Sequence, residues 1–489
     1  MVIDTILDAL ESDAEREAGL RFVELVAAYM TGTRDASGPV STPLMPAEIA
    51  PRFEEPMPAD GRPLAEVVAR VERDIMRDAN RLMHPMYVGH QVCGPLPVAV
   101  WMESLIAALN QSIAVSEMSP TGTPLETQLI RWMCDLAGLG PRAGGTFTSG
   151  GTEATFTGLL AARAAAMPDA WEEGVGDHAP VLLCGEHAHY AVTRAVAQLG
   201  LGMKRVVVVP SRDYRMDASV LSARLEELDR AQTRVMAVVA TAGSTSTGSF
   251  DDLETIGRLC EARGVWLHVD GAHGASALLS AGHRHRLRGI ERARSIAWDA
   301  HKMMLLPLPA GMLLVRDEGE LEAAFAQRAP YLFHGSDGER VWDQGTRSFM
   351  CSRRADALKV WVALQRYGAT GLGALYDHLC ATTRVLWEKI GERADFRVLH
   401  EPESNILCFH WVGNGELDTA ALDVVNRDVR ERYNRSGRGW ITTTILGGRR
   451  VLRVTIMNPR TRIEHLDALL DNLAEEGAQS ALRMAASRS

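Results

Sequence analysis

The feature that most limits the fold is a regular alternation of short apolar runs and helical stretches between residues 145 and about 317. The apolar runs are "VLLCG" (181–185), "RVVVVP" (205–210), "VMAVVATAG" (235–243), "VWLHVD" (265–270) and "GMLLVRD" (311–317). Segments with helical spacing, such as "SVLSARLEELDRAQ", separate them. Runs that are apolar on both faces are typical of strands in a parallel sheet covered by helices. The pattern therefore predicts an α/β domain built on a mostly parallel sheet.

The regions on either side of this domain have different patterns. Residues 4–30 carry apolar positions at helical spacing, and a segment rich in proline and glycine follows them. The C-terminal part combines a helix near 374–393, strand candidates "ILCFHWV" and "RVLRVTIM", and a closing helix "RIEHLDALLDNLAEE". We therefore predict a helical and extended N-terminal segment (1–75), a large α/β domain (76–372) and a small C-terminal α+β domain (373–489).

Composition excludes several classes of function. The chain has 489 residues and a net charge of −10, which argues against nucleic acid or an anionic membrane as a partner. Its seven cysteines are scattered without a CxxC pair, so we expect neither a disulfide framework nor a metal site. The N-terminus is acidic where a signal peptide is basic, and no apolar run approaches the about 20 residues that span a bilayer. We therefore expect a soluble cytoplasmic protein.

A glycine pair lies between a turn and an expected helix in "GGTFTSGGTEATFTGLLAARAAA" (144–166). Glycines let backbone amides approach an anion closely, and a helix N-terminus supplies unpaired N–H groups and a favourable dipole. Gly150, Gly151 and Thr152 are therefore candidates for a phosphate cradle. The segment is not a P-loop, because no GKS or GKT follows. The alternative is a turn with a helix N-cap and no ligand.

Asp270 ends an apolar strand in "WLHVDGAHGA" (266–275). A carboxylate at the carboxyl end of a strand in a parallel sheet lies where ligands bind, and its burial calls for a cationic partner. Gly271, Ala272 and Gly274 leave flat space that a ring can occupy. The alternative is an aspartate that only caps a helix.

Lys302 follows His301 in "SIAWDAHKMM" (295–304), at the end of an expected buried strand. A lysine in apolar surroundings is disfavoured as a cation, which makes its amine a usable nucleophile towards a carbonyl group. The alternative is a surface lysine whose stem covers apolar residues. The flanking runs "SIAW" and "MMLLPL" leave little surface for that arrangement.

The three motifs together predict one site. Pyridoxal phosphate requires an anion site, a carboxylate that holds its pyridine nitrogen protonated, and an amine for covalent attachment. The chain supplies these groups in this order, each after a strand of the same domain. Their coincidence favours a pyridoxal phosphate enzyme over the three separate alternatives.

Several further motifs agree with this interpretation. They are "SPTGTPLE" (119–126), "TSGGTEAT" (148–155), "HAHYAVTRA" (187–195), "TAGSTSTGSFDDL" (241–253), "LHVDGAHGA" (267–275), "DAHK" (299–302), "SRRADALKVW" (352–361) and "VLRVTIMNP" (451–459). Through them the chain resembles the group II pyridoxal-phosphate amino-acid decarboxylases over about residues 65–475. The resemblance implies the fold-type I transferase fold and a homodimer with shared active sites, in which the N-terminal segment wraps around the partner.

The resemblance also assigns roles to single residues. It implies that Lys302 binds the coenzyme aldehyde covalently, that Asp270 pairs with the pyridinium nitrogen, and that His189 stacks on the ring. From the residues alone, "HAH" fits a metal pair or, preferably, plain surface. The remaining residues match coenzyme contacts: Ala272 on the opposite ring face, Gly151, Thr152 and His301 at the phosphate, and Thr245 near the phenolic oxygen.

Tyr331 lies in "APYLFHGSDGERVWDQG" (329–345), a stretch that indicates a mobile loop. In the decarboxylases a tyrosine at the matching place closes over the neighbouring subunit's site and helps to protonate the carbanion. Related aldehyde synthases tend to carry phenylalanine there, so the tyrosine favours simple decarboxylation. Without the resemblance, an aromatic that anchors a loop is an equal interpretation.

The substrate pocket is expected to involve Tyr87, His90 and Gln91 in "HPMYVGHQVCG" (84–94), and Arg453 near the substrate carboxylate. His90 or Gln91 suits an acidic substrate, whereas the tail "WITTTILGGRRVLRVTIMNP" looks more like bacterial aromatic and tryptophan decarboxylases. We favour an aromatic or other bulky neutral L-amino acid, with glutamate, aspartate or diaminobutyrate as alternatives.

Two other functional classes remain open. An aldehyde synthase or carbon–carbon lyase shares the coenzyme, and a non-catalytic pyridoxal-binding regulator needs a DNA-binding domain that the sequence does not show. Gly271, Met303 and "PLPAG" (307–311) depart from the family's common residues. These changes bear on the shape of the pocket rather than on the class of reaction.

Overall fold

The structure, a computed structural model, describes residues 2–13, 15–34, 36–92, 94–325, 342–415 and 417–488. The chain divides into two compact units. The large unit comprises Gln91–Trp387 and Leu399–Cys408, and the small unit comprises Met1–His90, Glu388–Val398 and Phe409–Ser489. The division into three regions at residues 75 and 372 stays a prediction.

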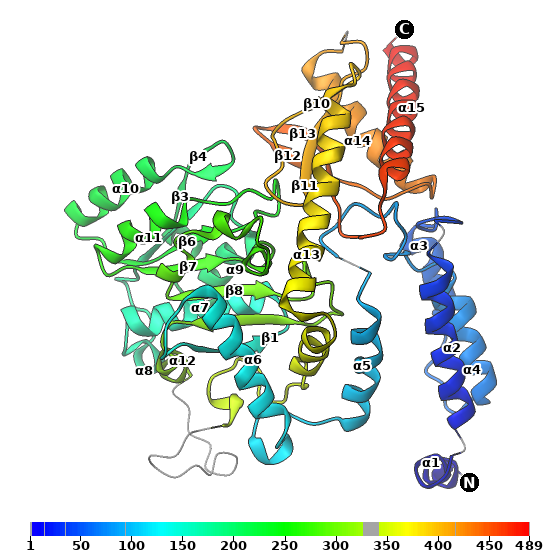
Figure 1. Cartoon of the computed structure of the whole chain (residues 1–489), viewed down its shortest axis with the longest axis horizontal. Coiled ribbons are helices and arrows are strands. Elements are labelled where there is room, and N and C mark those ends of the chain that lie inside the picture. Colours follow the sequence, from blue (N-terminus) through cyan, green and yellow to red (C-terminus); the bar gives the residue numbers. More distant parts are fainter. Residues whose placement is uncertain are drawn as a thin grey trace. The chain divides into compact units, whose positions relative to one another are not determined.

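A seven-stranded sheet forms the centre of the large unit (Figure 1). In order across the sheet its strands are β1 (Gly144–Thr148), β9 (Gly311–Val315), β8 (Ser295–Asp299), β7 (Trp266–Asp270), β6 (Val235–Thr241), β2 (Val181–Gly185) and β3 (Val206–Val209). The pairings from β8 through β7, β6 and β2 to β3 are all parallel. Helices cover this sheet, so the predicted fold class, a mostly parallel α/β fold of type I, is confirmed.

Strand β9 runs antiparallel to both of its neighbours, β1 and β8. Residues 300–310 connect β8 to β9 without an α-helix, and a parallel crossover needs a longer connection with a helix of its own. Strand β1 forms the start of the segment 144–166, where a turn was expected before the glycine pair. Gly145 is explained by close pairing, because a Cβ there would lie 2.1 Å from the carbonyl oxygen of Leu313.

Helices of the large unit pack on the sheet around one apolar core. Leu159 of α7 and Val192 and Val196 of α9 share this core with Ala237 and Trp266 of the sheet. The α-helices of this unit are α5 (Pro97–Leu109), α6 (Gly122–Ala137), α7 (Gly151–Ala166), α8 (Ala170–Glu173), α9 (Tyr190–Gln198), α10 (Ala218–Arg230), α11 (Leu253–Glu261) and α12 (Gly319–Ala324). A short hairpin, β4 (Ser211–Arg212) with β5 (Arg215–Met216), precedes α10. Helix α13 (Ala357–Gly391) begins in this unit and ends in the small one.

The small unit combines N-terminal helices with C-terminal α+β structure. A four-stranded sheet has the order β10 (Phe396–Val398), β11 (Ile406–Trp411), β13 (Arg449–Thr455) and β12 (Thr442–Leu446). Its helices are α1 (Val2–Glu11), α2 (Arg16–Gly32), α3 (Pro46–Ile49), α4 (Leu64–Arg70), α14 (Thr419–Arg435) and α15 (Ile463–Arg488). Across the described residues, we find no helix with the length and hydropathy needed to cross a membrane.

His268 in β7 makes the stability of the large unit depend on pH. Complete burial lowers the pKa of His268 from 6.5 to about 3, and its Nδ1 lies 2.8 Å from the hydroxyl of Ser295. Between these two pKa values the unfolded chain binds a proton that the folded chain does not. The free energy of unfolding should therefore decrease as the pH falls from 6.5 towards 3.

Replacing His268 by asparagine is expected to reduce this acid sensitivity. Between pH 6.5 and pH 5 the histidine accounts for about 2 kcal/mol of lost stability, at about 1.4 kcal/mol per pH unit. Denaturant unfolding of the wild type and His268→Asn at pH 7 and pH 5 measures this difference. The exposed His285→Asn is the matched control. Equal losses of stability in wild type and His268→Asn would contradict the prediction.

Candidate active site

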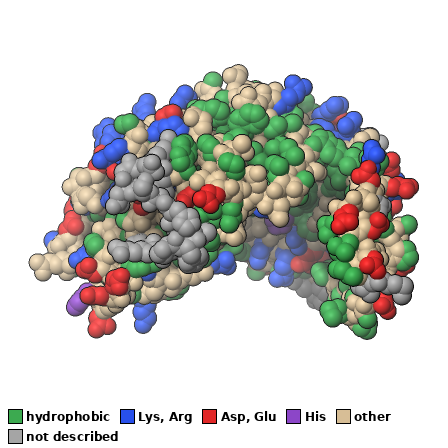
Figure 2. All heavy atoms as spheres, turned by 90° about the horizontal axis from the view of Figure 1, so that it is seen from below, with side chains coloured by type: hydrophobic (Ala, Val, Ile, Leu, Met, Phe, Trp, Pro, Cys, Tyr) green, Lys and Arg blue, Asp and Glu red, His purple; other side chains and the backbone are tan. Residues whose placement is uncertain are grey.

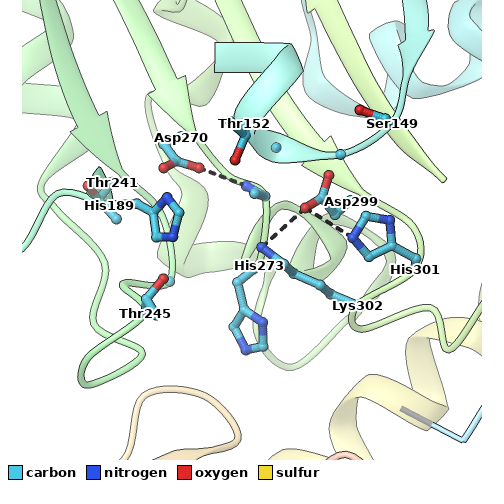
Figure 3. Close-up of a pocket in the computed structure, with 14 residues that line it drawn as sticks. Ser149, Thr152, His189, Thr241, Thr245, Asp270, His273, Asp299, His301 and Lys302 are labelled. Atoms are coloured by element: carbon cyan, nitrogen blue, oxygen red, sulfur yellow. Dashed lines mark hydrogen bonds and ion pairs between the residues drawn. The ribbon is translucent and has the colours of Figure 1, made fainter. Parts of the chain in front are cut away.

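A cavity of about 330 Å³ lies at the carboxyl ends of the parallel strands of the large unit (Figure 3). It contains most of the residues predicted to bind the coenzyme, and every lining residue belongs to the large unit. The lining residues are Ser149, Gly150, Gly151, Thr152, His189, Thr241, Gly243, Thr245, Asp270, Ala272, His273, Asp299, His301 and Lys302. The motifs that lie far apart in the sequence therefore meet in one place.

The start of helix α7 forms one wall of the cavity. The carbonyl of Gly150 accepts the first helical hydrogen bond, from the N–H of Ala154 at 3.0 Å. The amides of Gly151, Thr152 and Glu153 are therefore outside the helical ladder, as at any helix start. A Cβ on Gly151 would lie 2.7 Å from the Cβ of Ala272, so only glycine fits there without displacement. The helix dipole and these amides make this wall suitable for an anion.

Asp270 lies at the end of β7, beside Thr241 of β6 and Ala297 of β8. One of its carboxylate oxygens accepts the N–H of Ala272 at 3.2 Å. Burial raises the pKa of Asp270, while its electrostatic interactions with Lys302 and His189 lower it. A buried carboxylate of this kind is stabilised by a cationic ligand group within hydrogen-bond reach.

Lys302 and His301 both point towards Asp299, the last residue of β8 (Figure 3). The Nζ of Lys302 lies 3.1 Å from Oδ2 of Asp299, and the Nε2 of His301 lies 3.4 Å from the same oxygen. The Nδ1 of His301 accepts the N–H of Ala310 at 3.1 Å, so a neutral His301 carries its proton on Nε2. Burial lowers the pKa of His301, although Asp299 raises it.

His189 caps the N-terminus of α9, and its Nδ1 accepts the N–H of Ala191 at 3.2 Å. This bond leaves the proton on Nε2 in the neutral ring. Burial lowers the pKa of His189, although the charge of Asp270 raises it. His189 therefore presents a neutral ring to the cavity, on the same side as Asp270 and Thr245 (Figure 3).

Thr245 lies in a loop after β6 that three hydroxyl groups hold in shape. The hydroxyl of Thr247 lies 2.8 Å from those of both Ser244 and Ser249. The hydroxyl of Ser244 also accepts the backbone N–H of Thr247 at 3.2 Å. This network fixes the backbone on which Thr245 enters the cavity.

Sequence reasoning missed several lining residues. Asp299 and His273 stand inside the quoted motifs, but nothing in their spacing marks them as part of the site. The Nε2 of His273 lies 2.7 Å from the amide oxygen of Asn405, a residue far away in the sequence. Only the folded chain reveals that pairing. Ser149, Thr241 and Gly243 complete the set of residues that were not predicted.

Three of the four predicted substrate residues, Tyr87, His90 and Arg453, belong to the small unit, where Tyr87 and His90 lie beside Trp440 and the charge of Arg453 acts on His90. The rings of Tyr87 and Trp440 stack with centroids 6.2 Å apart, and the ring of His90 lies 6.5 Å from that of Trp440. The Nη1 of Arg453 donates to the hydroxyl of Thr442 at 3.2 Å. We call Tyr87, His90, Trp440 and Arg453 the Trp440 cluster.

Gln91, the fourth predicted substrate residue, and Tyr331, the predicted general acid, are not among the residues described above for the coenzyme cavity and the Trp440 cluster. Gln91 is the first residue of the large unit, and among the described residues it is not part of the cavity lining. Tyr331 lies outside the described residues. The roles assigned to both residues stay predictions.

Comparison with known proteins identifies the family. Residues 46–412 match the family described as "Pyridoxal-dependent decarboxylase conserved domain". The chain is 33% identical over 426 residues to L-2,4-diaminobutyrate decarboxylase of Rhizobium meliloti (strain 1021), covering 86% of this chain and 83% of the relative. It is 30% identical over 425 residues to acidic amino acid decarboxylase GADL1 of Bos taurus, covering 84% and 81%. The crystal structure of mouse CSAD in apo form is similar with a TM-score of 0.85 and 28% identity, covering 93% of this chain and 99% of that one.

The chain therefore belongs to the pyridoxal-dependent decarboxylases. It is an enzyme that removes CO2 from an amino acid with pyridoxal phosphate as its coenzyme.

The cavity residues fit this coenzyme on chemical grounds. The open amides of α7 suit a phosphate, the buried carboxylate of Asp270 suits a cationic ring nitrogen, and Lys302 offers an amine to an aldehyde. The small side chains at Gly151 and Ala272 leave room for a flat ring.

Proposed function

We propose that this decarboxylase acts on an L-amino acid with an acidic side chain and releases the corresponding amine and CO2. This proposal replaces the preference for an aromatic substrate drawn from the sequence. Of the two curated relatives described above, one is named for acidic amino acids and the other for diaminobutyrate. Neither name refers to an aromatic substrate.

The observation that carries this proposal is the charge around His90 in the Trp440 cluster. Burial lowers the pKa of His90, and the positive charges of Arg453 and Arg430 lower it further. Arg453 is expected near the carboxylate that every amino acid carries, so Arg430 is the guanidinium that favours an anionic side chain, because arginine pairs with carboxylate in a planar, two-pronged geometry. A diamino side chain would add a third positive charge to the same place.

We propose the following roles for the residues of the coenzyme site. Pyridoxal phosphate, when bound, supplies an aldehyde for covalent attachment and a ring that takes up the electron pair left by CO2. Lys302 holds the coenzyme in the resting enzyme and releases the product amine at the end. Asp270 keeps a proton on the ring nitrogen, and His189 and Ala272 pack against the two ring faces. Gly150, Gly151, Thr152 and His301 hold the phosphate, and Thr245 lies near the phenolic oxygen.

The remaining roles concern the substrate. We propose that Arg453, Tyr87, His90 and Gln91 bind it and that Tyr331 returns a proton to Cα as a general acid. Tyrosine at position 331 also argues against an aldehyde synthase in this proposal.

The proposal is tested by measuring CO2 and amine released from aspartate, glutamate, cysteine sulfinate, 2,4-diaminobutyrate, tryptophan and tyrosine. We expect kcat/KM to be highest for an acidic substrate. Changing Arg453 to methionine should lower this value by about 10²-fold, mainly through KM, because a charge-assisted pair is lost. The surface variant Arg212→Met is the matched control. Preference for tryptophan, tyrosine or diaminobutyrate would contradict the proposal.

An aromatic substrate is the second candidate. The stack of Tyr87 on Trp440 favours it, because such a surface also accepts a third ring. The same set of substrates decides between the two candidates.

We further propose a homodimer with shared active sites. Helix α5 exposes Trp101, Leu105 and Leu109, and α1 exposes Ile6 and Leu10. Figure 2 shows hydrophobic side chains gathered on one face of the molecule. Apolar surface of this kind marks an interaction site. Sedimentation should give twice the chain mass of 53.4 kDa, and an active monomer would contradict the proposal.

A further inference from the structure

Asp299 is a buried carboxylate in the middle of the cavity whose role the proposed function leaves open. Its residue is 1% exposed at the end of β8. Its backbone is fixed on both sides, because its N–H donates to the carbonyl of Ala272 at 3.1 Å and its carbonyl accepts the N–H of Lys302 at 3.2 Å. The side chain is therefore held facing the cavity by the main chain around it.

The carboxylate of Asp299 lies between the start of α7 and the side chains of Lys302 and His301 (Figure 3). Its Oδ2 contacts Lys302 and His301, as described above. Its Oδ1 is buried and has no hydrogen-bond partner among the described residues. Such an oxygen is costly to leave alone and marks a place where a polar ligand group is expected.

The same carboxylate faces the glycines of the proposed phosphate site. A Cβ on Gly151 would lie 3.1 Å from Oδ2 of Asp299, and a Cβ on Gly150 would lie 4.0 Å from Oδ1. The Cβ on Gly150 would also lie 3.2 Å from Cε1 of His301. A phosphate held by Gly150, Gly151 and His301 is therefore an anion next to an anion, in a place where burial strengthens repulsion.

We propose that Asp299 determines how strongly this protein holds the phosphate of its coenzyme. In the coenzyme-free protein its carboxylate pairs with Lys302 and His301 and faces the start of α7. When the coenzyme enters, the phosphate competes with Asp299 for His301 and for that helix start, and Lys302 must leave Asp299 to reach the aldehyde. This role rests on the proposed coenzyme site. In that site Asp299 is a group of the protein itself that competes with the coenzyme phosphate.

Asp299→Asn removes the charge and keeps the size of the side chain, so it tests the proposal directly. The measurement is the Kd of pyridoxal phosphate and of pyridoxal, which lacks the phosphate, followed by absorbance and by quenching of tryptophan fluorescence. We expect the ratio of Kd for pyridoxal to Kd for pyridoxal phosphate to rise by about tenfold in Asp299→Asn, because one like charge is removed. Inorganic phosphate alone should also bind the variant more tightly than the wild type.

Repeating the measurement in a variant without Lys302 separates the effect of Asp299 on the phosphate from the loss of its ion pair with Lys302. In Lys302→Met the coenzyme binds without a covalent bond, and Asp299→Asn added to this variant should raise the same ratio by a similar factor. The matched control is Asp252→Asn, which removes one charge from the exposed N-cap of α11 and leaves a residue that also caps helices. It should leave the ratio unchanged.

Two results would overturn the proposal in different ways. An unchanged or lower ratio in both backgrounds would remove the role of Asp299 and leave the coenzyme site standing. Failure of the wild type to bind pyridoxal phosphate would overturn the proposed coenzyme site together with this role.

Discussion

Changing Lys302 to alanine is expected to lower the rate of decarboxylation by about 10³-fold or more, the scale of losing a covalent catalytic group. The physical reason is that its amine is the group placed to bind the coenzyme aldehyde. It lies in the cavity with Asp270 and His189, while the residues that follow it, Met303 and Met304, are buried. Without this amine the coenzyme is bound only by non-covalent contacts.

The chemistry of attachment gives a second readout. Borohydride reduction should fix the coenzyme on a single peptide of the wild type and on none of the variant. The chain has only four lysines, which are Lys204, Lys302, Lys359 and Lys389. Lys204 is exposed, so Lys204→Ala is the control that should retain labelling and activity. Labelling that persists in Lys302→Ala would contradict the assignment.

Changing Asp270 to asparagine is expected to have the next largest effect, a loss of activity of about 10²-fold or more from electrostatic stabilisation of the coenzyme ring. Burial raises the pKa of Asp270, so the folded coenzyme-free protein favours the protonated form more than the unfolded chain does. Stability contributed by this group therefore falls as the pH rises through the window above 3.8. The neutral asparagine avoids this cost.

Stability and activity should change in opposite directions, and measuring both checks this prediction. At pH 7 the coenzyme-free Asp270→Asn protein should unfold at a higher denaturant concentration than the wild type, while its kcat falls. Asp270→Glu retains the charge and should recover part of the activity. An asparagine variant that is less stable in the coenzyme-free form would show that Asp270 serves the fold rather than the coenzyme.

Much of the fold could be predicted because local signals agree with the tertiary structure. The run at 181–185 has the same bounds as β2, and the runs at 235–243 and 265–270 contain β6 and β7. Each is apolar on both faces, as expected for strands of a sheet that helices cover on both sides. Strand β1 was not predicted, because it begins with Gly144 and Gly145 and glycine is a weak signal for a strand. The close approach of β9 that requires Gly145 is visible only in the folded chain.

In the candidate site, too, residues with a local sequence signal could be predicted, whereas contacts between side chains could not. Asp270, His189 and Lys302 could be proposed because each follows a recognisable strand and matches a family motif. Asp299 was quoted with Lys302, yet its pairing depends on a backbone turn that brings residues 299 and 302 together. The direction of β9 could not be predicted from its composition either, since parallel and antiparallel strands here have the same apolar content. The preference for an aromatic substrate rested on the C-terminal tail, and the named relatives do not support it.

The position of the cavity has a consequence for the order of folding events. Its residues follow β1, β2, β6, β7 and β8 and extend along the chain from Ser149 to Lys302. The binding site therefore exists only after strands distant in sequence have paired, which is a slow process for a sheet of high contact order. We expect added pyridoxal phosphate to leave the rate of refolding unchanged and to slow unfolding, because a ligand that recognises only the finished sheet stabilises the native state alone.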